Sequence, residues 1–224
     1  LPPANVQSIK TYVDSMNGEL NRIFGIPTGD SIWRGKAVLC VFSTKTRFGA
    51  FEEKVMNNPN HAGRAGVRGG PRRFIQTAIA TQFNPQVARV LCWGYSLGFA
   101  RRLHSDAQGV PWLNMGIANA MQSMIAPNPR AERAQRDRVT QNLRRNSSLL
   151  GLLKATRLDQ DRWPICGEIV KFLIAQDSVA FGQMFRDAKM GLSIEDALMQ
   201  NFGLTLDELA GRFGRSLGVA NVSA

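Results

Sequence analysis

The sequence predicts an α+β fold that is mostly helical, with a small sheet confined to the N-terminal half. Most segments place apolar residues at helical spacing, whereas short strand-like apolar runs occur only between residues 37 and 81. At 224 residues the chain can form one sizeable domain, or two subdomains that share a core. We expect an α/β subdomain at 1–125 and an all-helical subdomain at 126–224, because a proline-rich break follows residue 125.

The N-terminal elements follow from their patterns and stop signals. Residues 6–24 have helical periodicity and end at Gly25, with Pro27 beyond, so they predict an amphipathic helix. Residues 37–42 form a short β-branched run that predicts a buried strand, and residues 46–56 return to a helical pattern. Residues 74–81 alternate weakly, which predicts an edge strand.

Between these elements, residues 57–73 are rich in glycine and arginine and predict a loop. Arginine forks pair with phosphates, and glycine lets the backbone approach them. Because aromatic residues are scarce in this loop, we favour a solvated loop, or one ordered against a partner, over a nucleic-acid site. The candidate anion-binding or partner-binding residues of this loop are Arg64, Arg68, Arg72 and Arg73.

Two consecutive helices at 87–103 and 112–124 form the predicted centre of the fold. A polar turn at 104–109 joins them, and Pro111 suits the first turn of the second helix. Both helices carry apolar residues at i, i+3 and i+4 spacing, so these faces should meet in the core. The facing residues are Val90, Trp93 and Leu97 on the first helix and Leu113, Ile117 and Met121 on the second.

The C-terminal half reads as a series of helices. The arginine-rich segment 130–145 is either a surface helix with a basic stripe or a disordered connector, and Arg133, Arg136 and Arg144 fall near one face as further candidates for anion or partner binding. Helices are expected at 148–155, 163–174, 177–190, 193–203 and 205–217. Ser193 and Thr205 are suited to cap the helices at 193–203 and 205–217, and Gly203 is suited to end the helix at 193–203.

Charge and cysteine content narrow the function classes. A formal net charge of +11 favours anionic partners, although a solvated basic surface within an assembly explains it equally well. No apolar run is long enough to span a membrane, and no signal peptide is visible at the start. The three cysteines lack metal-site spacing and lie in apolar segments, so we expect buried free thiols.

Residues 94–98 read G-x-S-x-G, the motif in which α/β-hydrolases present a nucleophilic serine, here Ser96. That chemistry needs a histidine base late in the chain, whereas the two histidines are His61 and His104. His104 would lie about 12 Å along the same helix from Ser96. A serine hydrolase that uses Ser96 is therefore a less favoured alternative.

The order of these motifs resembles the gluzincins, the thermolysin-like metallopeptidases. The resemblance rests on Phe24-Gly25-Ile26-Pro27, the strand at 38–42, the paired helices at 90–99 and 112–119, and the tail at 191–198 and 202–209. In this family the first central helix carries two zinc-binding histidines and a catalytic glutamate, and the second carries a third ligand. The resemblance assigns these positions to Trp93, Gly94, Leu97 and Met115, with Asn119 at an outer acidic position.

The resemblance implies a gluzincin-like fold without the chemistry of the family. Zinc needs nitrogen or oxygen ligands and a nearby carboxylate base, which these residues do not supply. We therefore expect a non-catalytic pseudo-peptidase without metal or cofactor, which acts as a protein-binding or structural subunit of a larger assembly. The resemblance also implies an extracytoplasmic setting. The alternative is a binder of nucleic acid or another anionic polymer through the basic loops.

Overall fold

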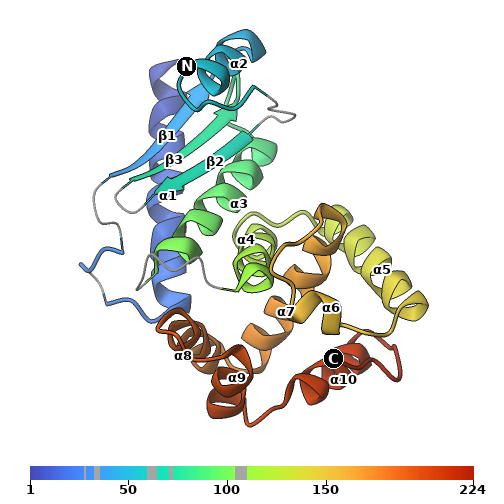
Figure 1. The fold of residues 1–224 in the computed structure, drawn as a ribbon. Coiled ribbons are helices and arrows are strands. Elements are labelled where there is room, and N and C mark those ends of the chain that lie inside the picture. Colours follow the sequence, from blue (N-terminus) through green and yellow to red (C-terminus); the bar gives the residue numbers. More distant parts are fainter. Residues whose placement is uncertain (28, 33–35, 60–64, 71–72, 104–109) are drawn as a thin grey trace.

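The computed structural model describes residues 1–27, 29–32, 36–59, 65–70, 73–103 and 110–224, which form a mostly helical α+β fold with one three-stranded sheet (Figure 1). This confirms the predicted fold class at that level. The elements are α1 (Pro3–Ile23), β1 (Lys36–Phe42), α2 (Lys45–Lys54), β2 (Ala65–Gly70), β3 (Arg73–Ile79), α3 (Pro85–Arg102), α4 (Pro111–Ile125), α5 (Pro129–Arg145), α6 (Leu150–Leu153), the 3₁₀ turn η1 (Gln160–Arg162), α7 (Trp163–Gln176), α8 (Ser178–Lys189), α9 (Ile194–Phe202) and α10 (Leu206–Ser216).

The sheet corrects two predictions. Its order is β1-β3-β2, with β1 parallel and β2 antiparallel to β3. The glycine- and arginine-rich segment was expected to be a loop throughout, but part of it forms β2. Because β2 pairs with the open side of β3, β3 is the central strand and not an edge.

Helices α2 and α3 cover opposite faces of the sheet, as neighbouring side chains of β3 show. The Gln76 side-chain amide donates to the carbonyls of Val90 and Leu91 in α3, at 3.1 and 3.2 Å. The next residue, Thr77, donates its hydroxyl hydrogen to the buried carboxylate of Glu52 in α2. Successive strand residues point to opposite faces, so α2 and α3 lie on opposite sides of β3. The α2 side is only partly covered, because Val38 of β1 stays exposed there.

Glycines let α3 lie very close to the sheet. A Cβ added at Gly94 would lie 2.3 Å from the Gln76 amide nitrogen, and one added at Gly98 would lie 2.2 Å from the Phe74 ring. The two glycines are four residues apart and so share one helix face. This face of α3 is therefore shaped to receive β3.

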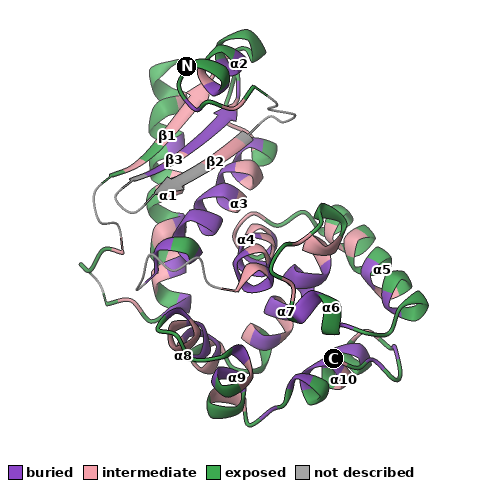
Figure 2. Ribbon diagram, viewed as in Figure 1, coloured by how far each residue is buried: buried purple, intermediate pink, exposed green. Residues whose placement is uncertain are grey.

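A second glycine contact joins α4 to α7. A Cβ at Gly116 would lie 2.5 Å from a methyl carbon of Val170, and one at Gly167 would lie 2.6 Å from the Cβ of Asn119. The main hydrophobic cluster runs from Met16 in α1 to Val222 at the C-terminal end, so the two predicted subdomains share one core. Figure 2 shows this buried material along α3, α4 and α7.

A buried lysine also joins the two halves. Lys189 of α8 is 2% exposed, and its ammonium donates to the carbonyl of Arg101 in the last turn of α3, at 2.9 Å. A cation at a helix C-terminus complements the helix dipole. The end of α3 is thus held by the helical half of the chain.

The core faces of the central helices differ from the prediction on one side. Leu113, Ile117 and Met121 of α4 are fully buried, as expected. On α3, Leu97 is buried as predicted, but Val90 and Trp93 are only partly buried, and Cys92, Tyr95 and Phe99 contribute to the main core instead. The face of α3 that packs in the main core is therefore rotated about the helix axis relative to the predicted face.

Most C-terminal helices match their predicted ranges. Segment 130–145 is a helix, which settles the choice against a disordered connector. Thr205 and Glu208 form a capping box, and Gly203 ends α9 with φ of 63°. The helix predicted at 148–155 is shorter, with only Leu150–Leu153 helical. Within the described ranges, every helix is too short or too polar to cross a bilayer.

The glycine contact with the sheet predicts opposite effects for two glycine-to-alanine variants. Gly98→Ala should lower the free energy of unfolding by about 1–3 kcal/mol, because the new methyl group overlaps the Phe74 ring. Gly18→Ala in α1 should raise it by about 0.5–1 kcal/mol, because nothing lies within 4 Å of the added Cβ and alanine favours helix. Urea unfolding of both variants measures the difference, and a neutral Gly98→Ala would contradict the packing.

Candidate functional site

The positions that the resemblance assigns to a zinc site lie along one stretch of α3 and the facing part of α4. Leu97 is 2% exposed, and its side chain is part of the interior. Gly94 has no side chain, and the Gln76 amide occupies the space beside its Cα. Neither Leu97 nor Gly94 therefore presents an accessible side-chain group that could bind a ligand from solvent.

Trp93 takes part in an aromatic contact that the sequence did not suggest. Its ring stacks on that of Trp163, the first residue of α7, with centroids 5.6 Å apart and planes at 26°. Aromatic pairs of this geometry contribute about 0.5–1.5 kcal/mol beyond the area they bury. The stack fastens α3 to α7.

Met115 and Asn119 lie one turn apart on α4. The Asn119 amide nitrogen donates to the Met115 carbonyl at 2.8 Å, so this side chain is turned back onto its own helix. Met115 is partly exposed and lines a pocket of about 160 Å³. The other lining residues are Arg101, Pro111, Asn114, Thr156, Leu158 and Trp163.

These residues do not fit a zinc ion. Leucine has no ligand atom, glycine has no side chain, and the indole nitrogen of tryptophan is a hydrogen-bond donor only. Among the described residues, no three histidine, cysteine, aspartate or glutamate side chains lie close enough together to hold a metal. Beside α3 and α4 lies instead a pocket with a mixed polar and apolar lining, in which Trp163 of α7 joins Met115 and the Arg101 guanidinium.

Ser96 lies in the middle of α3, and not at a strand-to-helix turn. It is 0% exposed, and its hydroxyl lies 3.9 Å from the Cys92 sulfur. His61 and His104 fall outside the described residues. The geometry of a nucleophilic serine, which requires an exposed side chain on a sharp turn, is not present at Ser96.

The predicted anion-binding arginines are described to different extents. Arg133, Arg136 and Arg144 are exposed on α5. Arg64 and Arg72 lie outside the described residues, whereas for Arg68 and Arg73 the backbone alone is described, in β2 and β3. Only the α5 group can therefore be placed.

Sequence reasoning missed Gln76 and Trp163, which occupy the space around Gly94 and Trp93. Both come from elements distant in the chain, and no local pattern marks them. A tryptophan before Pro164 at a helix start was visible, but it predicted only where α7 begins.

In comparisons with known proteins, no family model, no curated protein and no solved structure matches the chain.

The burial of Ser96 predicts that a fluorophosphonate probe will leave the folded protein unlabelled. Such probes need an exposed, activated hydroxyl, whereas this one is enclosed within α3. Intact-mass measurement after incubation checks the outcome, with a known serine hydrolase as the positive control. A single adduct mapped to Ser96 would reverse this conclusion.

The three cysteines should differ in reactivity. Burial raises the pKa of Cys92 to about 11 and that of Cys166 to about 12, and it also raises the pKa of the partly buried Cys40. Because the thiolate is the reactive form, iodoacetamide at about pH 8 should modify Cys40 first and the other two only after unfolding in urea. Peptide mapping by mass spectrometry gives the order; modification of Cys92 before Cys40 would contradict it.

Proposed function

We propose that the chain is a catalytically inactive, gluzincin-like domain that binds a protein partner within a larger assembly. One observation carries this proposal: packed side chains occupy the positions at which the resemblance places zinc and its base. Trp93 is stacked on Trp163, and the Gln76 amide fills the space beside Gly94.

The energetics of these positions favour packing over hydrolysis. A zinc site needs a wet, polar cleft that keeps one coordination position open for water. The stacked indoles and Leu97 instead gain free energy by excluding water, at about 25 cal/mol per Å² of apolar surface buried. On this proposal, the pair α3 and α4 is retained for its packing, and the zinc ligands and general base are absent.

The pocket beside Met115 is the proposed docking point. Met115, Leu158 and Trp163 contribute apolar groups to its mixed lining, and Arg101 adds a cation. Methionine adapts its shape to different partners, and Trp and Arg are frequent among residues that dominate interface energies. An apolar side chain of a partner segment, followed or preceded by an acidic group, would match this combination.

The cellular setting is part of the same proposal. Gluzincin-like domains are often exported, so we place the assembly outside the cytoplasm. This part rests on the resemblance alone.

A charge placed in the pocket should release the partner. We expect the protein in native extract to elute in a complex larger than the isolated chain, and Met115→Glu to return it to the mass of the isolated chain. The introduced carboxylate would be buried against apolar groups of the partner, which is unfavourable for binding. Size-exclusion chromatography with light scattering measures the masses.

Val179→Glu is the matched control, because it adds the same charge at an apolar residue of α8 that is 76% exposed. It should leave the complex intact. The proposal fails if the unmodified chain has the same mass alone and in extract, or if Met115→Glu keeps the complex. Zinc-dependent cleavage of peptides by the purified chain would refute the inactive assignment.

A further inference from the structure

Helix α5 projects from the rest of the molecule. Only Val139 and Leu143 of its 17 residues are buried. Figure 2 shows it as a largely exposed helix at the edge of the fold, away from the sheet. A helix of this length is about 25 Å long, and most of its circumference faces solvent.

Arginines occupy the exposed part of this circumference on both sides. At about 100° per residue, all but Arg136 spread over roughly 140° of the helix, centred opposite Val139 and Leu143. Arg136 lies about 40° from the centre of the buried face. Measured from that centre, Arg133 and Arg144 lie on one flank, and Arg138 and Arg145 lie on the other. The exposed arginines of α5 are Arg130, Arg133, Arg136, Arg138, Arg144 and Arg145.

Little negative charge balances these arginines. In the part of the chain that the structure describes, none of the six makes an ion pair. Glu132 faces inward, where it accepts from the Asn128 backbone at 2.7 Å and pairs with Arg89 of α3 at 3.5 Å. Asp137 is the remaining acid of α5, and it lies close to the middle of the outward arc, between the two flanks.

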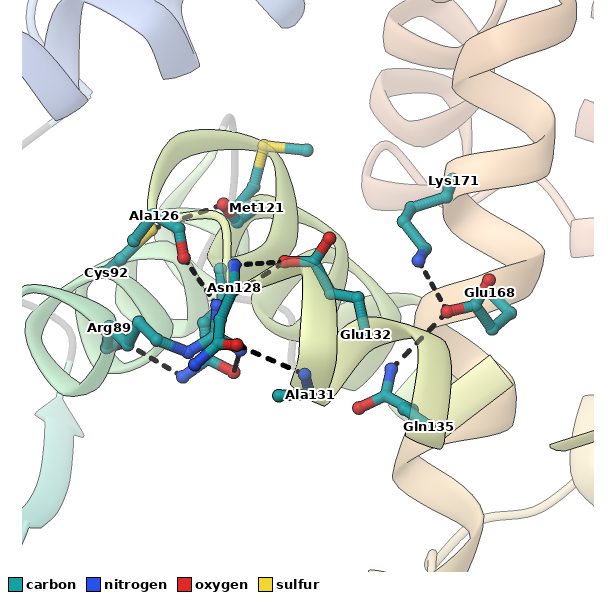
Figure 3. A network of polar contacts seen from close by, with 11 residues as sticks. Arg89, Cys92, Met121, Ala126, Asn128, Ala131, Glu132, Gln135, Glu168 and Lys171 are labelled. Carbon is teal, nitrogen blue, oxygen red and sulfur yellow. Dashed lines mark hydrogen bonds and ion pairs between the residues drawn. The ribbon is translucent and has the colours of Figure 1, made fainter. Parts of the chain in front are cut away.

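Polar contacts fix α5 to its neighbours, and Figure 3 shows those of its N-terminal half. Arg89 donates to the Ala126 carbonyl just before α5, and the Gln135 amide donates to Glu168 of α7. Farther along, the Arg136 guanidinium donates to the Ser216 carbonyl at the end of α10, at 3.0 Å. The remaining arginines are therefore presented on a fixed support, which reduces the entropy lost on binding.

We propose that α5 enters the major groove of duplex DNA and binds phosphates of both strands, irrespective of base sequence. The groove is about 12 Å wide and accepts an α-helix of about 10–12 Å diameter. Arginines on two flanks of one helix can then reach the two phosphate rows that border the groove. On a flat anionic surface, only one flank could make contact.

Two further features favour the sugar-phosphate backbone over other partners. Large apolar residues are missing from the described exposed surface of α5, so the apolar centre of a protein interface is lacking there. Aromatic residues are also missing from α5, which leaves no platform for single-stranded bases. This inference is independent of the Met115 pocket and of the proposed protein partner.

Two double variants, one for each flank, test the groove geometry. Arg133→Gln with Arg144→Gln removes one flank, and Arg138→Gln with Arg145→Gln removes the other. Each should weaken binding to a fluorescent duplex of about 20 base pairs by roughly 10- to 100-fold at about 0.1 M salt, and lower the slope of log K against log salt by about 1.8. Fluorescence anisotropy between about 50 and 200 mM salt measures both quantities.

Lys10→Gln with Arg47→Gln is the matched control, because it removes two exposed cations from α1 and α2. It should leave the slope unchanged. Arg133→Lys with Arg144→Lys keeps the charge and should keep the slope, which separates lost charge from lost folding. Circular dichroism confirms that each variant is folded.

Several results would overturn the inference. The unmodified chain could fail to bind the duplex at low salt, or the control could lower the slope as much as the flank variants. An effect of one flank alone would indicate a flat partner. Binding to vesicles that contain phosphatidylserine, or to polyglutamate, without binding to the duplex would assign α5 to a membrane or to an acidic protein.

Discussion

The close approach of β3 to α3 is the constraint on which the rest of the fold depends. The central strand lies so near this helix that only glycine fits at positions 94 and 98. In return, the Gln76 side-chain amide reaches the carbonyls of Val90 and Leu91, and the Phe74 ring covers Gly98. Burying the amide nitrogen is favourable only with such hydrogen bonds, so the strand and the helix fix each other's position.

This constraint links the packing of α3 to the question of catalysis. Gly94 is the position that the resemblance assigns to the catalytic glutamate, and any side chain there would collide with Gln76. At the neighbouring Trp93, the space beside α3 is taken by Trp163 of α7. Histidines and a glutamate placed at these positions of α3 would therefore collide with β3 and α7.

The sequence predicted what depends on local pattern, and it failed where pairing is distant. The helices have clear periodicity, caps and proline or glycine boundaries, so α7 to α10 were predicted closely. The strand β2 was missed because Gly66, Gly69 and Gly70 have low strand propensity, and its stability comes from hydrogen bonds with β3. The partners of the site residues were missed for a similar reason, because Gln76 and Trp163 reach α3 only through the tertiary fold.

The distribution of charge explains why α5 stands out on a basic protein. Interior ion pairs, such as Lys171 with the buried Glu168, are neutral as a unit and remove one acid and one base from the surface together. Other acids are bound at helix starts, where Glu208 accepts from the Thr205 backbone and its pKa is lowered by that hydrogen bond. The whole excess of +11 must therefore be carried by groups outside these pairs. Helix α5 has six such arginines and only two buried residues, so its charge adds little to folding. The electrostatic attraction of these arginines can therefore contribute to the binding of an anionic partner.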